Sequence, residues 1–206
     1  MKKRKKVLII VENLPVPLDT RVWLEANSLC KKGYEVIIIC PKGKGYNKTY
    51  ENINNIHIYR HPLPFEGKNM LGYLMEYSCA LFFEFIYSLI ILFKHGFDII
   101  HACNPPDTIF LIGAFYKLLG KKFIFDHHDI NPELYVAKFA RKDIFYKVLL
   151  MLERLTYFFA DVSIATNESF REIAIKRGKM SPEKVFVVRS FPNLDCFGSK
   201  TENEYE

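Results

Sequence analysis

Two glycine motifs, GxGxxG and GxxxxGK[ST], are missing from this 206-residue sequence. The loop after the first apolar run, from Asn13 to Asp19, contains no glycine at all. Glycines in these motifs let the backbone touch a pyrophosphate at a helix N-terminus. Their absence argues against binding of NAD, FAD or a nucleoside triphosphate in that mode.

The sequence is also poor in features that stabilise or export secreted proteins. Its 5 cysteines form an odd set without a CxxC pair, and most lie in apolar runs, which is typical of reduced thiols. The apolar run after the basic start, Val7 to Val11, ends at Glu12 without a small-residue cleavage site. We therefore expect no export signal and a location on the cytosolic side of a membrane.

No apolar stretch without charges is long enough to span a bilayer. The strongest candidate, Leu71 to Phe93, is interrupted by Glu76 and Glu84, and its longest uncharged part, Phe85 to Phe93, is far below the roughly 20 residues required. The sequence predicts that this segment does not span a membrane. An interfacial helix remains open.

The length and the distribution of charge predict one domain that is preceded by a basic N-terminal segment. The net charge is +6, and five positive charges stand together at Lys2 to Lys6, so the rest is nearly neutral, which argues against a nucleic-acid partner. A 50% hydrophobic content supplies a core without disulfides or metals. We expect a basic tail at 1–5, one domain at 6–194 and a linker or tail at 195–206.

Short β-branched runs alternate with longer helical segments, which predicts an α/β fold of the Rossmann-like, three-layer type. Its mainly parallel sheet would have six or seven strands. Strands are expected at 6–11, 35–40, 56–60, 98–103, 122–126, 161–165 and 185–189, and helices at 20–32, 70–95, 106–119, 143–159 and 169–177. The polar stretch 41–55 is expected to be a loop.

In such sheets the working site lies where the strands end and the chain turns into helices. That rule selects the loops 13–21, 103–107, 126–133 and 166–168. The candidate substrate-binding residues on these loops are Asp19, Arg21, Asn104, Asp107, Glu133 and Thr166. Asp19 and Arg21 could meet a hydroxyl-rich ligand, or they could cap the helix and pair with each other.

The densest titratable cluster predicts the catalytic group. Asp126, His128 and Asp129 are the candidate catalytic residues, because a carboxylate next to a histidine orients its ring and raises its basicity. The alternative is that His128 bonds a loop carbonyl. Adjacent histidines on an extended segment point to opposite faces, so no metal site is predicted. His101 lies within a strand, which is more typical of a core histidine.

The segment Leu71 to Phe93 is apolar nearly all round, with a narrow polar stripe that includes Glu76 and Glu84. One interpretation is a helix that covers the sheet. The other is a contact with a membrane surface or a partner protein, which the basic start would assist.

Several strings in the sequence are informative when taken together. They are Val7-Leu8-Ile9-Ile10, Asp19-Thr20-Arg21-Val22-Trp23-Leu24-Glu25-Ala26, Gly33-Tyr34-Glu35-Val36, Asp98-Ile99-Ile100-His101-Ala102, Pro105-Pro106-Asp107, Phe125-Asp126-His127-His128-Asp129, Pro132-Glu133 and Asp161-Val162-Ser163-Ile164-Ala165-Thr166. In their order and spacing they resemble the N-terminal half of the glycosyltransferase family 4 (group 1) enzymes of the GT-B fold. The resemblance covers the chain from about Val7 to Leu194.

The resemblance implies two Rossmann-like domains around a cleft and sugar transfer with retention of configuration, without a metal or other cofactor. The donor would be a nucleotide sugar and the acceptor a lipid-linked molecule or a saccharide, with the N-terminal half on the acceptor side. By position, His128 resembles the family's cleft histidine, and Asp126 and Asp129 match its flanking acids. The family's frequent Gly-Gly in the first loop is replaced by Pro15-Val16-Pro17.

The family's ExxxxxxxE donor motif would lie beyond this chain. We therefore expect the acceptor-side half of a retaining glycosyltransferase, inactive without a C-terminal donor-domain partner. The alternative is a noncatalytic subunit that recruits a donor-binding partner to a membrane through 71–93, as in the split dolichol-pathway GlcNAc transferase. A flavodoxin-like ligand-binding domain is a third possibility.

Overall fold

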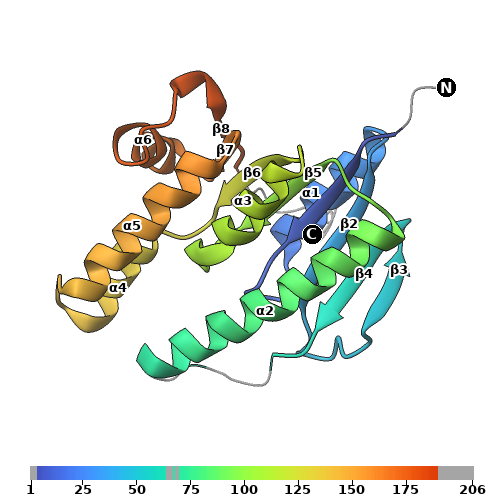
Figure 1. The fold of residues 1–206 in the computed structure, drawn as a ribbon, viewed down its shortest axis with the longest axis horizontal. Helices are drawn as coiled ribbons and strands as arrows, with labels where there is room; N and C mark the ends of the chain where they lie inside the picture. Colours follow the sequence, from blue (N-terminus) through green and yellow to red (C-terminus); the bar gives the residue numbers. More distant parts are fainter. Residues whose placement is uncertain (1–3, 64–66, 68–69, 190–206) are drawn as a thin grey trace, which may run out of the picture.

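The computed structural model describes residues 4–63, 67 and 70–189, and the side chain of Met70 is not described. An eight-stranded sheet runs through it in the order β3-β4-β2-β1-β5-β6-β7-β8 (Figure 1). The strands are β1 (Lys6–Ile10), β2 (Glu35–Pro41), β3 (Tyr50–Ile53), β4 (Ile56–His61), β5 (Ile99–Cys103), β6 (Lys122–His127), β7 (Val162–Ala165) and β8 (Val185–Val187). All neighbouring strands are parallel except the antiparallel pair β3 and β4.

Six α-helices surround this sheet in the described part of the chain. They are α1 (Thr20–Lys31), α2 (Met70–Lys94), α3 (Phe110–Leu118), α4 (Asn131–Phe139), α5 (Ile144–Phe159) and α6 (Glu168–Lys176), with single 3-10 turns at Asp107–Ile109 and Pro182–Lys184. The predicted α/β, Rossmann-like class with a mainly parallel sheet is confirmed.

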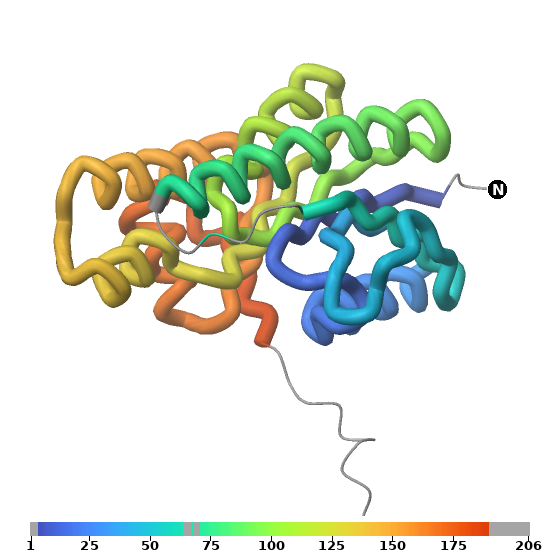
Figure 2. Tube along the Cα trace, turned by 90° about the horizontal axis from the view of Figure 1, so that it is seen from below, coloured from blue at the N-terminus to red at the C-terminus, as the bar shows by residue number. Residues whose placement is uncertain are grey.

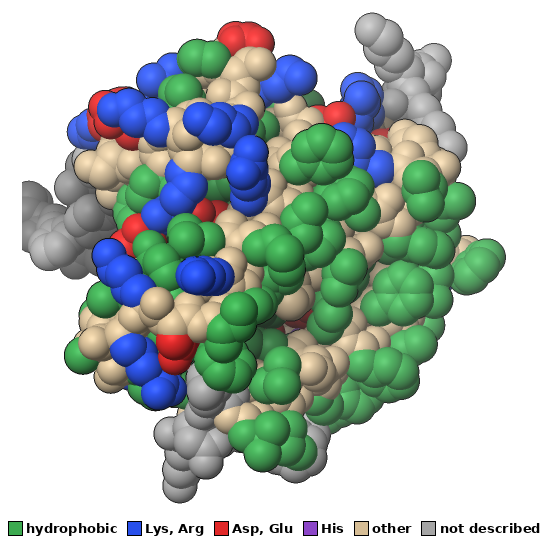
Figure 3. Space-filling model, turned by 60° about the vertical axis from the view of Figure 1, so that its left-hand side comes forward, with side chains coloured by type: hydrophobic (Ala, Val, Ile, Leu, Met, Phe, Trp, Pro, Cys, Tyr) green, Lys and Arg blue, Asp and Glu red, His purple; other side chains and the backbone are tan. Residues whose placement is uncertain are grey.

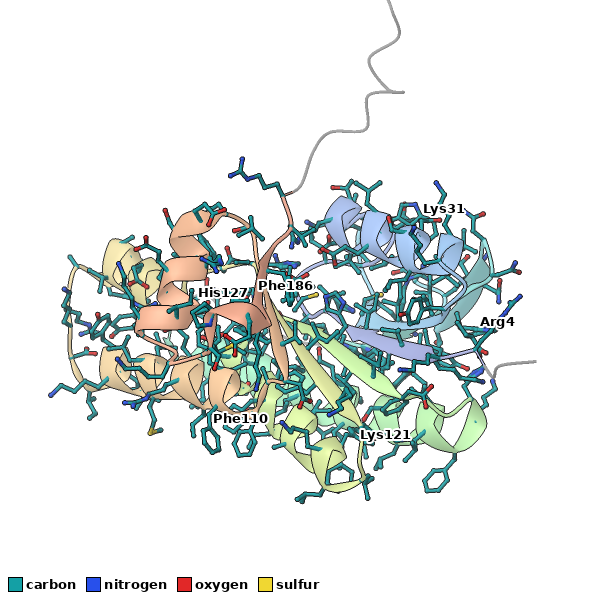
Figure 4. The ribbon with its side chains drawn as sticks, turned by 90° about the horizontal axis from the view of Figure 1, so that it is seen from above. Arg4, Lys31, Phe110, Lys121, His127 and Phe186 are labelled. Carbon is teal, nitrogen blue, oxygen red and sulfur yellow. The ribbon has the colours of Figure 1, made fainter. Side chains whose placement is uncertain are left out.

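Side-chain alternation in the central strands divides the core into two clusters. Leu8 and Ile10 of β1 face the cluster that holds residues of α2, α3 and α5. Val7 and Ile9 face the other cluster, which is closed by α1. Figure 4 accordingly shows Lys31 at the end of α1 on one side of the sheet, and Phe110 and Lys121 on the other. The domain therefore has three layers, with one side covered by α2, α3 and α5.

The eighth strand corrects the predicted count of six or seven. The stretch 41–55 was predicted to be a loop, but β3 forms a hairpin with β4, in which Tyr50 lies opposite Tyr59. Asn54 and Asn55 both have positive φ at the turn, a conformation that asparagine tolerates and that matches the twist of a two-residue hairpin. Strand β3 lies at the edge of the sheet and is partly exposed, so it lacks the apolar run that identifies the inner strands.

The second difference is α4, in the segment that the sequence assigned to the loop 126–133. Pro132 stands in its first turn, a position where a missing N–H costs nothing, and Ala140 closes the helix in the left-handed region. Glu133 therefore lies in a helix and not in a loop. The expected basic tail and C-terminal linker fall largely on residues 1–3 and 190–206, outside the described residues.

The chain order creates a switch point at β1. From β1 the chain first adds β2 and β4 on one side, and then β5, β6, β7 and β8 on the other. The carboxyl ends of β1, β5 and β6 thus meet at one edge of the sheet, where ligands bind in open α/β folds. The end of β8 also reaches this edge beside α1, where Arg21 Nη1 donates to the carbonyl of Val188 at 3.0 Å (Figure 2).

Two local features fix the helices that frame this edge. Asp19 caps α1 by accepting from the amide of Val22 at 3.0 Å, and Gly33, with φ of +87°, ends the turn after the helix. Gly113 lets α3 approach the sheet closely, because a Cβ at that position would lie 2.7 Å from the ring of Phe123. The start of α3 is thereby held against β6.

Helix α2 is continuous over 25 residues, although Glu76 and Glu84 interrupt its apolar sequence. By length and composition it is the one helix among the described residues that could cross a membrane. In the fold it lies along the sheet and contacts β2 and β4. Two of its polar side chains, Glu84 and Ser88, are completely buried.

Candidate functional site

The carboxylate of Asp126, near the end of β6, is the centre of a buried polar cluster. Its Oδ1 accepts from Arg21 Nη2 of α1 at 2.9 Å. Its Oδ2 lies 3.1 Å from His101 Nε2 of β5 and 2.9 Å from His128 Nε2. Glu25 completes the cluster, with Oε1 3.2 Å from Arg21 Nε and Oε2 3.6 Å from His101 Nε2. Four elements therefore supply five titratable side chains to one point.

The electrostatics of the cluster keep one carboxylate charged. Burial raises the pKa of Asp126, but hydrogen bonds from His101 and His128 outweigh this effect, and its pKa lies well below the usual range. Burial, and then the charge of Asp126, raise the pKa of Glu25 to about 7. Burial lowers the pKa of His101, but its bond to Asp126 more than compensates, so the net shift is upward. Asp126 is thus the anion, and Arg21 is its permanent counter-charge.

His128 is placed so that one ring nitrogen is committed to this cluster. Its Nε2 lies between Asp126 Oδ2 and Arg21 Nε, which is 3.0 Å away. Arg21 Nε donates to this nitrogen, and Asp126 Oδ2 lies 2.9 Å from it, so both contacts of Nε2 are within the cluster. Among the described residues no hydrogen bond uses His128 Nδ1, and 16% of the side chain is exposed. The second nitrogen is therefore available to a ligand at the sheet edge.

Asn104 holds the backbone around His128. Its Oδ1 accepts from the amides of His128 at 2.7 Å and Asp129 at 3.2 Å. Its Nδ2 donates to Asp107 Oδ1 at 2.9 Å and to the carbonyl of Asp129 at 2.7 Å. Three of these four hydrogen bonds join the loop after β5 to the loop after β6, which fixes the position of the imidazole.

Asp107 is the second buried carboxyl group of this edge. Its Oδ2 accepts from Asn131 Nδ2 at 2.8 Å, and its backbone carbonyl accepts from the hydroxyl of Thr156 at 2.7 Å. Burial raises its pKa to about 7, although the bonds from Asn131 and Asn104 act in the opposite direction. Burial also raises the pKa of the half-buried Asp129. These contacts anchor the loop through both carboxylate oxygens of Asp107.

The remaining predicted residues lie apart from the Asp126 cluster or have structural partners. Asp19 caps α1. Glu133, in the first turn of α4, forms an ion pair with Arg177. Thr166 follows β7 and accepts a long hydrogen bond of 3.5 Å from Asn167. No described contact joins Glu133 or Thr166 to His128.

His127, labelled in Figure 4, packs on the rings of Tyr157 and Phe170, whereas His128 joins the Asp126 cluster. It is buried, and its Nδ1 lies 2.7 Å from the hydroxyl of Tyr157. Burial, together with the charge of Arg177, lowers its pKa to about 3. This histidine therefore stays neutral in the core and takes no part in the site.

Two residues of the site, Glu25 and His101, were not among the predicted ones. Glu25 stands four residues after Arg21 on α1, and this spacing places both side chains on one helix face. That signal was present in the sequence. His101 pairs in register with Ile9 of β1 and Ile124 of β6, so only the strand order shows that it meets Asp126.

Three groups in the described part of the chain bring enough ligand atoms together for a metal ion. Two of them share Asp126: one with His101 and Cys103, the other with Glu25 and His128. In both, Arg21 already supplies a positive charge to Asp126, in competition with a cation. The third group is Glu35, His57 and His95, with Lys6 Nζ 3.0 Å from Glu35 Oε1.

The domain has a mainly parallel sheet, a polar cluster at the carboxyl edge of this sheet and a switch point at β1. One domain of a GT-B glycosyltransferase has this architecture. The sequence matches the family description Glycosyltransferase Family 4 over residues 19–195. The chain belongs to this family, as its sequence strings indicated.

Solved structures agree at the level of the fold. Sucrose-phosphate synthase from Thermosynechococcus elongatus superposes with a TM-score of 0.65 at 16% identity, covering 93% of this chain and 49% of that one. Starch synthase IV from Arabidopsis thaliana, bound to ADP and acarbose, gives 0.58 at 12% identity, with 98% and 54% covered. A glycosyltransferase from Rickettsia africae gives 0.55 at 16% identity, with 95% and 45% covered. The chain therefore spans about half the length of these proteins.

Proposed function

We propose that this chain is the acceptor-side half of a retaining glycosyltransferase, which moves a sugar from a nucleotide-sugar donor to a lipid-linked or saccharide acceptor. The observation that carries the proposal is the Asp126 cluster, which commits one nitrogen of His128 and leaves the other at the sheet edge. Family membership supports a nucleotide-sugar donor and a glycan acceptor. The likeness to about half of two larger enzymes supports a donor-binding partner domain.

In this proposal His128 Nδ1 meets a hydroxyl group of the substrate. Asp126 remains ionised and holds the ring through Nε2, so the imidazole has a fixed orientation. Asn104 fixes the loop that carries it. Asp129 is the third catalytic candidate. Arg21 would act on the substrate through Asp126. The other proposed substrate contacts are Asp19, Asp107, Glu133 and Thr166.

Transfer needs the donor diphosphate and the acceptor hydroxyl in one dehydrated cleft, so this half supplies only one wall. We propose that no metal is required, because Arg21 provides the positive charge beside Asp126. The proposed location is cytoplasmic, at the inner face of a membrane. The four described cysteines are free thiols, in keeping with a reducing compartment.

The binding test uses the isolated chain and a panel of sugars and oligosaccharides, read by saturation-transfer NMR in the presence of EDTA. We expect binding that is lost in His128→Asn and kept in His57→Asn, a histidine at the opposite edge of the sheet. Equal binding by both variants, or binding only with added metal, would contradict this site.

The activity test uses UDP-, GDP- and ADP-sugars and measures nucleotide release. The isolated chain should not transfer sugar, and a complex with its donor-binding partner should form a product with the anomeric configuration of the donor. In that complex His128→Asn should lower kcat by about 10²-fold or more. Robust transfer by the isolated chain would overturn the division between two halves.

A second candidate function is a noncatalytic subunit that recruits a donor-binding partner to a membrane. The exposed apolar side of α2 favours it, since Phe82 and Phe93 are 61% and 86% exposed. In this case the complex with the donor-binding partner would keep its kcat in His128→Asn and would lose activity only on membrane-bound acceptors when α2 is altered. That outcome separates the two functions.

A further inference from the structure

Helix α2 carries apolar residues on both its inward and its outward side, which differs from the one-sided pattern of a helix on the surface of a water-soluble domain. The completely buried side chains include Glu84 and Ser88, and both carboxylate oxygens of Glu84 lack a hydrogen-bond partner among the described residues. The outward side carries Phe82, Ile90 and Phe93, which are 61%, 48% and 86% exposed. Core packing alone would place the apolar residues inward and the carboxylate outward.

The two neighbouring helices on the same side of the sheet continue the apolar surface. On α3, Leu118 is 86% exposed, and on α5, Met151 and Phe158 are 53% and 75% exposed. Figure 3 shows hydrophobic side chains spread over a broad area of this side. We name the exposed apolar residues of α2, α3 and α5 the apolar face. A continuous face of this kind marks an interaction surface rather than scattered exposure.

An open groove runs between α2 and α3 within this face. It has a volume of about 390 Å³ and is lined by Leu81, Phe82, Phe85, Leu111, Ile112 and Phe115, with Ser78 as the one polar residue. Water in such a groove would find almost no hydrogen-bond partners, whereas a hydrocarbon chain would fill it favourably. The groove fits an apolar, deformable occupant.

The charged residues around the apolar face indicate which sign of charge a binding partner would carry. The acidic residues of the three helices are Glu76, Glu84 and Glu153, and each is buried or half-buried. The exposed charges on these helices are Lys94, Lys147 and Arg154, all basic, and Lys117 is half-buried. On α5, Lys147 stands four residues before Met151 and Arg154 three residues after it, so they border the apolar stripe. Lys and Arg also border the hydrophobic area in Figure 3.

From this arrangement we propose that the apolar face docks the domain on an anionic lipid bilayer, with α2, α3 and α5 lying in the plane of the membrane. Aromatic and aliphatic side chains enter the acyl boundary, and the bordering lysines and arginine meet lipid phosphates. Helix α2 does not span, because Glu84 and Ser88 are buried inside the domain and the hydroxyl of Ser88 lies 2.9 Å from that of Tyr116 on α3. The proposal is independent of the catalytic role of His128.

Binding is tested with the whole chain and two kinds of vesicle, phosphatidylcholine alone and phosphatidylcholine with phosphatidylglycerol. The chain should float with the anionic vesicles. The triple variant Phe82→Ser, Ile90→Ser, Phe93→Ser should lower the partition coefficient at least tenfold. A matched control, Leu18→Ser, Leu24→Ser, Phe186→Ser, removes three exposed apolar residues outside the face and should float like the wild type.

The charge contribution is tested with Lys94→Gln, Lys147→Gln, Arg154→Gln. Because each basic residue near an anionic surface contributes about 1 kcal/mol, partition onto anionic vesicles should fall about fivefold per substitution. Lys31→Gln, Lys32→Gln, Lys184→Gln changes the net charge equally elsewhere and should have a much smaller effect. An equal effect of both sets would show nonspecific attraction and overturn the assigned surface.

The orientation is tested by fluorescence quenching with brominated lipids. In a Trp23→Phe background, single tryptophans are introduced as Leu71→Trp, Phe82→Trp or Phe93→Trp. Docking in the plane predicts equal, shallow quenching depths along α2, whereas a spanning helix would place position 82 deepest and overturn the proposal.

Two further results would overturn the proposal that the apolar face docks on a membrane. One is a wild-type chain, folded by circular dichroism, that floats with neither kind of vesicle. The other is a concentration-dependent dimer in analytical ultracentrifugation, abolished by the Phe82, Ile90 and Phe93 substitutions, in a chain that ignores vesicles. This second result would assign the apolar face to a second copy of the chain.

Discussion

Replacement of Asp126 by Asn tests the central electrostatic claim, that one buried carboxylate holds the site together. Asp126 is fully buried, and its two oxygens face Arg21, His101 and His128 at 2.9, 3.1 and 2.9 Å. An asparagine turns one oxygen into a donor, so a donor would face a donor, and the guanidinium loses its counter-charge. Breaking such a buried pair costs roughly 3–5 kcal/mol, and we expect this loss near pH 7.

The assay is urea unfolding of the isolated chain, followed by circular dichroism. Because the pKa of Asp126 is depressed in the folded state, its stabilisation is complete above the unfolded pKa of about 4 and is lost as the pH falls through the folded value. The gap between wild type and variant should therefore be present at pH 7 and close as the pH falls below about 4. The exposed Glu172→Gln serves as control and should not shift the unfolding midpoint measurably.

A double-mutant cycle with Arg21→Met separates pairing from a general loss of packing. If the two charges stabilise each other, the double variant is less destabilised than the sum of the single ones, by roughly 0.5–3 kcal/mol. An Asp126→Asn variant that loses less than about 1 kcal/mol, the size of an exposed ion pair, would refute the reasoning.

Three other changes test separate parts of the structure. Burial, and then the charge of Glu12, raise the pKa of Glu84 to about 8, so the ionisation of Glu84 should destabilise the wild type as the pH rises from about 4.5 to 8. Glu84→Gln removes this loss. The difference in unfolding free energy between variant and wild type should therefore grow by up to about 1.4 kcal/mol per pH unit. A difference that does not change with pH would contradict a buried, titrating Glu84. Asn104→Ala removes four hydrogen bonds, three of them between two loops, and should cost roughly 1–3 kcal/mol in urea unfolding while weakening saccharide binding. Unchanged binding would separate Asn104 from the position of His128. Gly113→Ala places a Cβ 2.7 Å from the Phe123 ring. We expect it to cost about 1–3 kcal/mol of stability and to lower the midpoint of thermal unfolding. An unchanged midpoint would mean that α3 can move away from the sheet.

The inner strands were predictable because a strand buried on both faces must be apolar throughout. β2 shows this most clearly, since every residue from Val36 to Cys40 is completely buried. Edge strands carry no such constraint. β3 exposes about half of its side chains and contains Glu51 and Asn52, so its sequence reads as a loop until its partner β4 is known.

The candidate site also has a part that the sequence predicts and a part that it does not. Asp126, His128 and Asp129 are neighbours in the sequence, and their cluster is visible without a structure. The partners of Asp126 come from far along the chain: Arg21 is 105 residues away and His101 is 25 residues away. Their convergence depends on the order of β1, β5 and β6 and on the packing of α1, which local patterns do not specify.

The site and the apolar face share one structural element, and this links the two proposals. Asp107, bonded to the asparagine that fixes the His128 loop, opens the turn that leads into α3. Leu111, 51% exposed on the apolar face, follows four residues later, which is roughly 6 to 8 Å along the helix axis. A bilayer on that face would therefore bring its headgroup region close to the carboxyl edge of the sheet. A lipid-linked acceptor could then keep its chain in the membrane while its hydroxyl reaches His128, whereas a free saccharide would gain nothing from this arrangement. Loss of transfer to lipid-linked acceptors only, in the Phe82, Ile90 and Phe93 variant, is the result that this geometry requires.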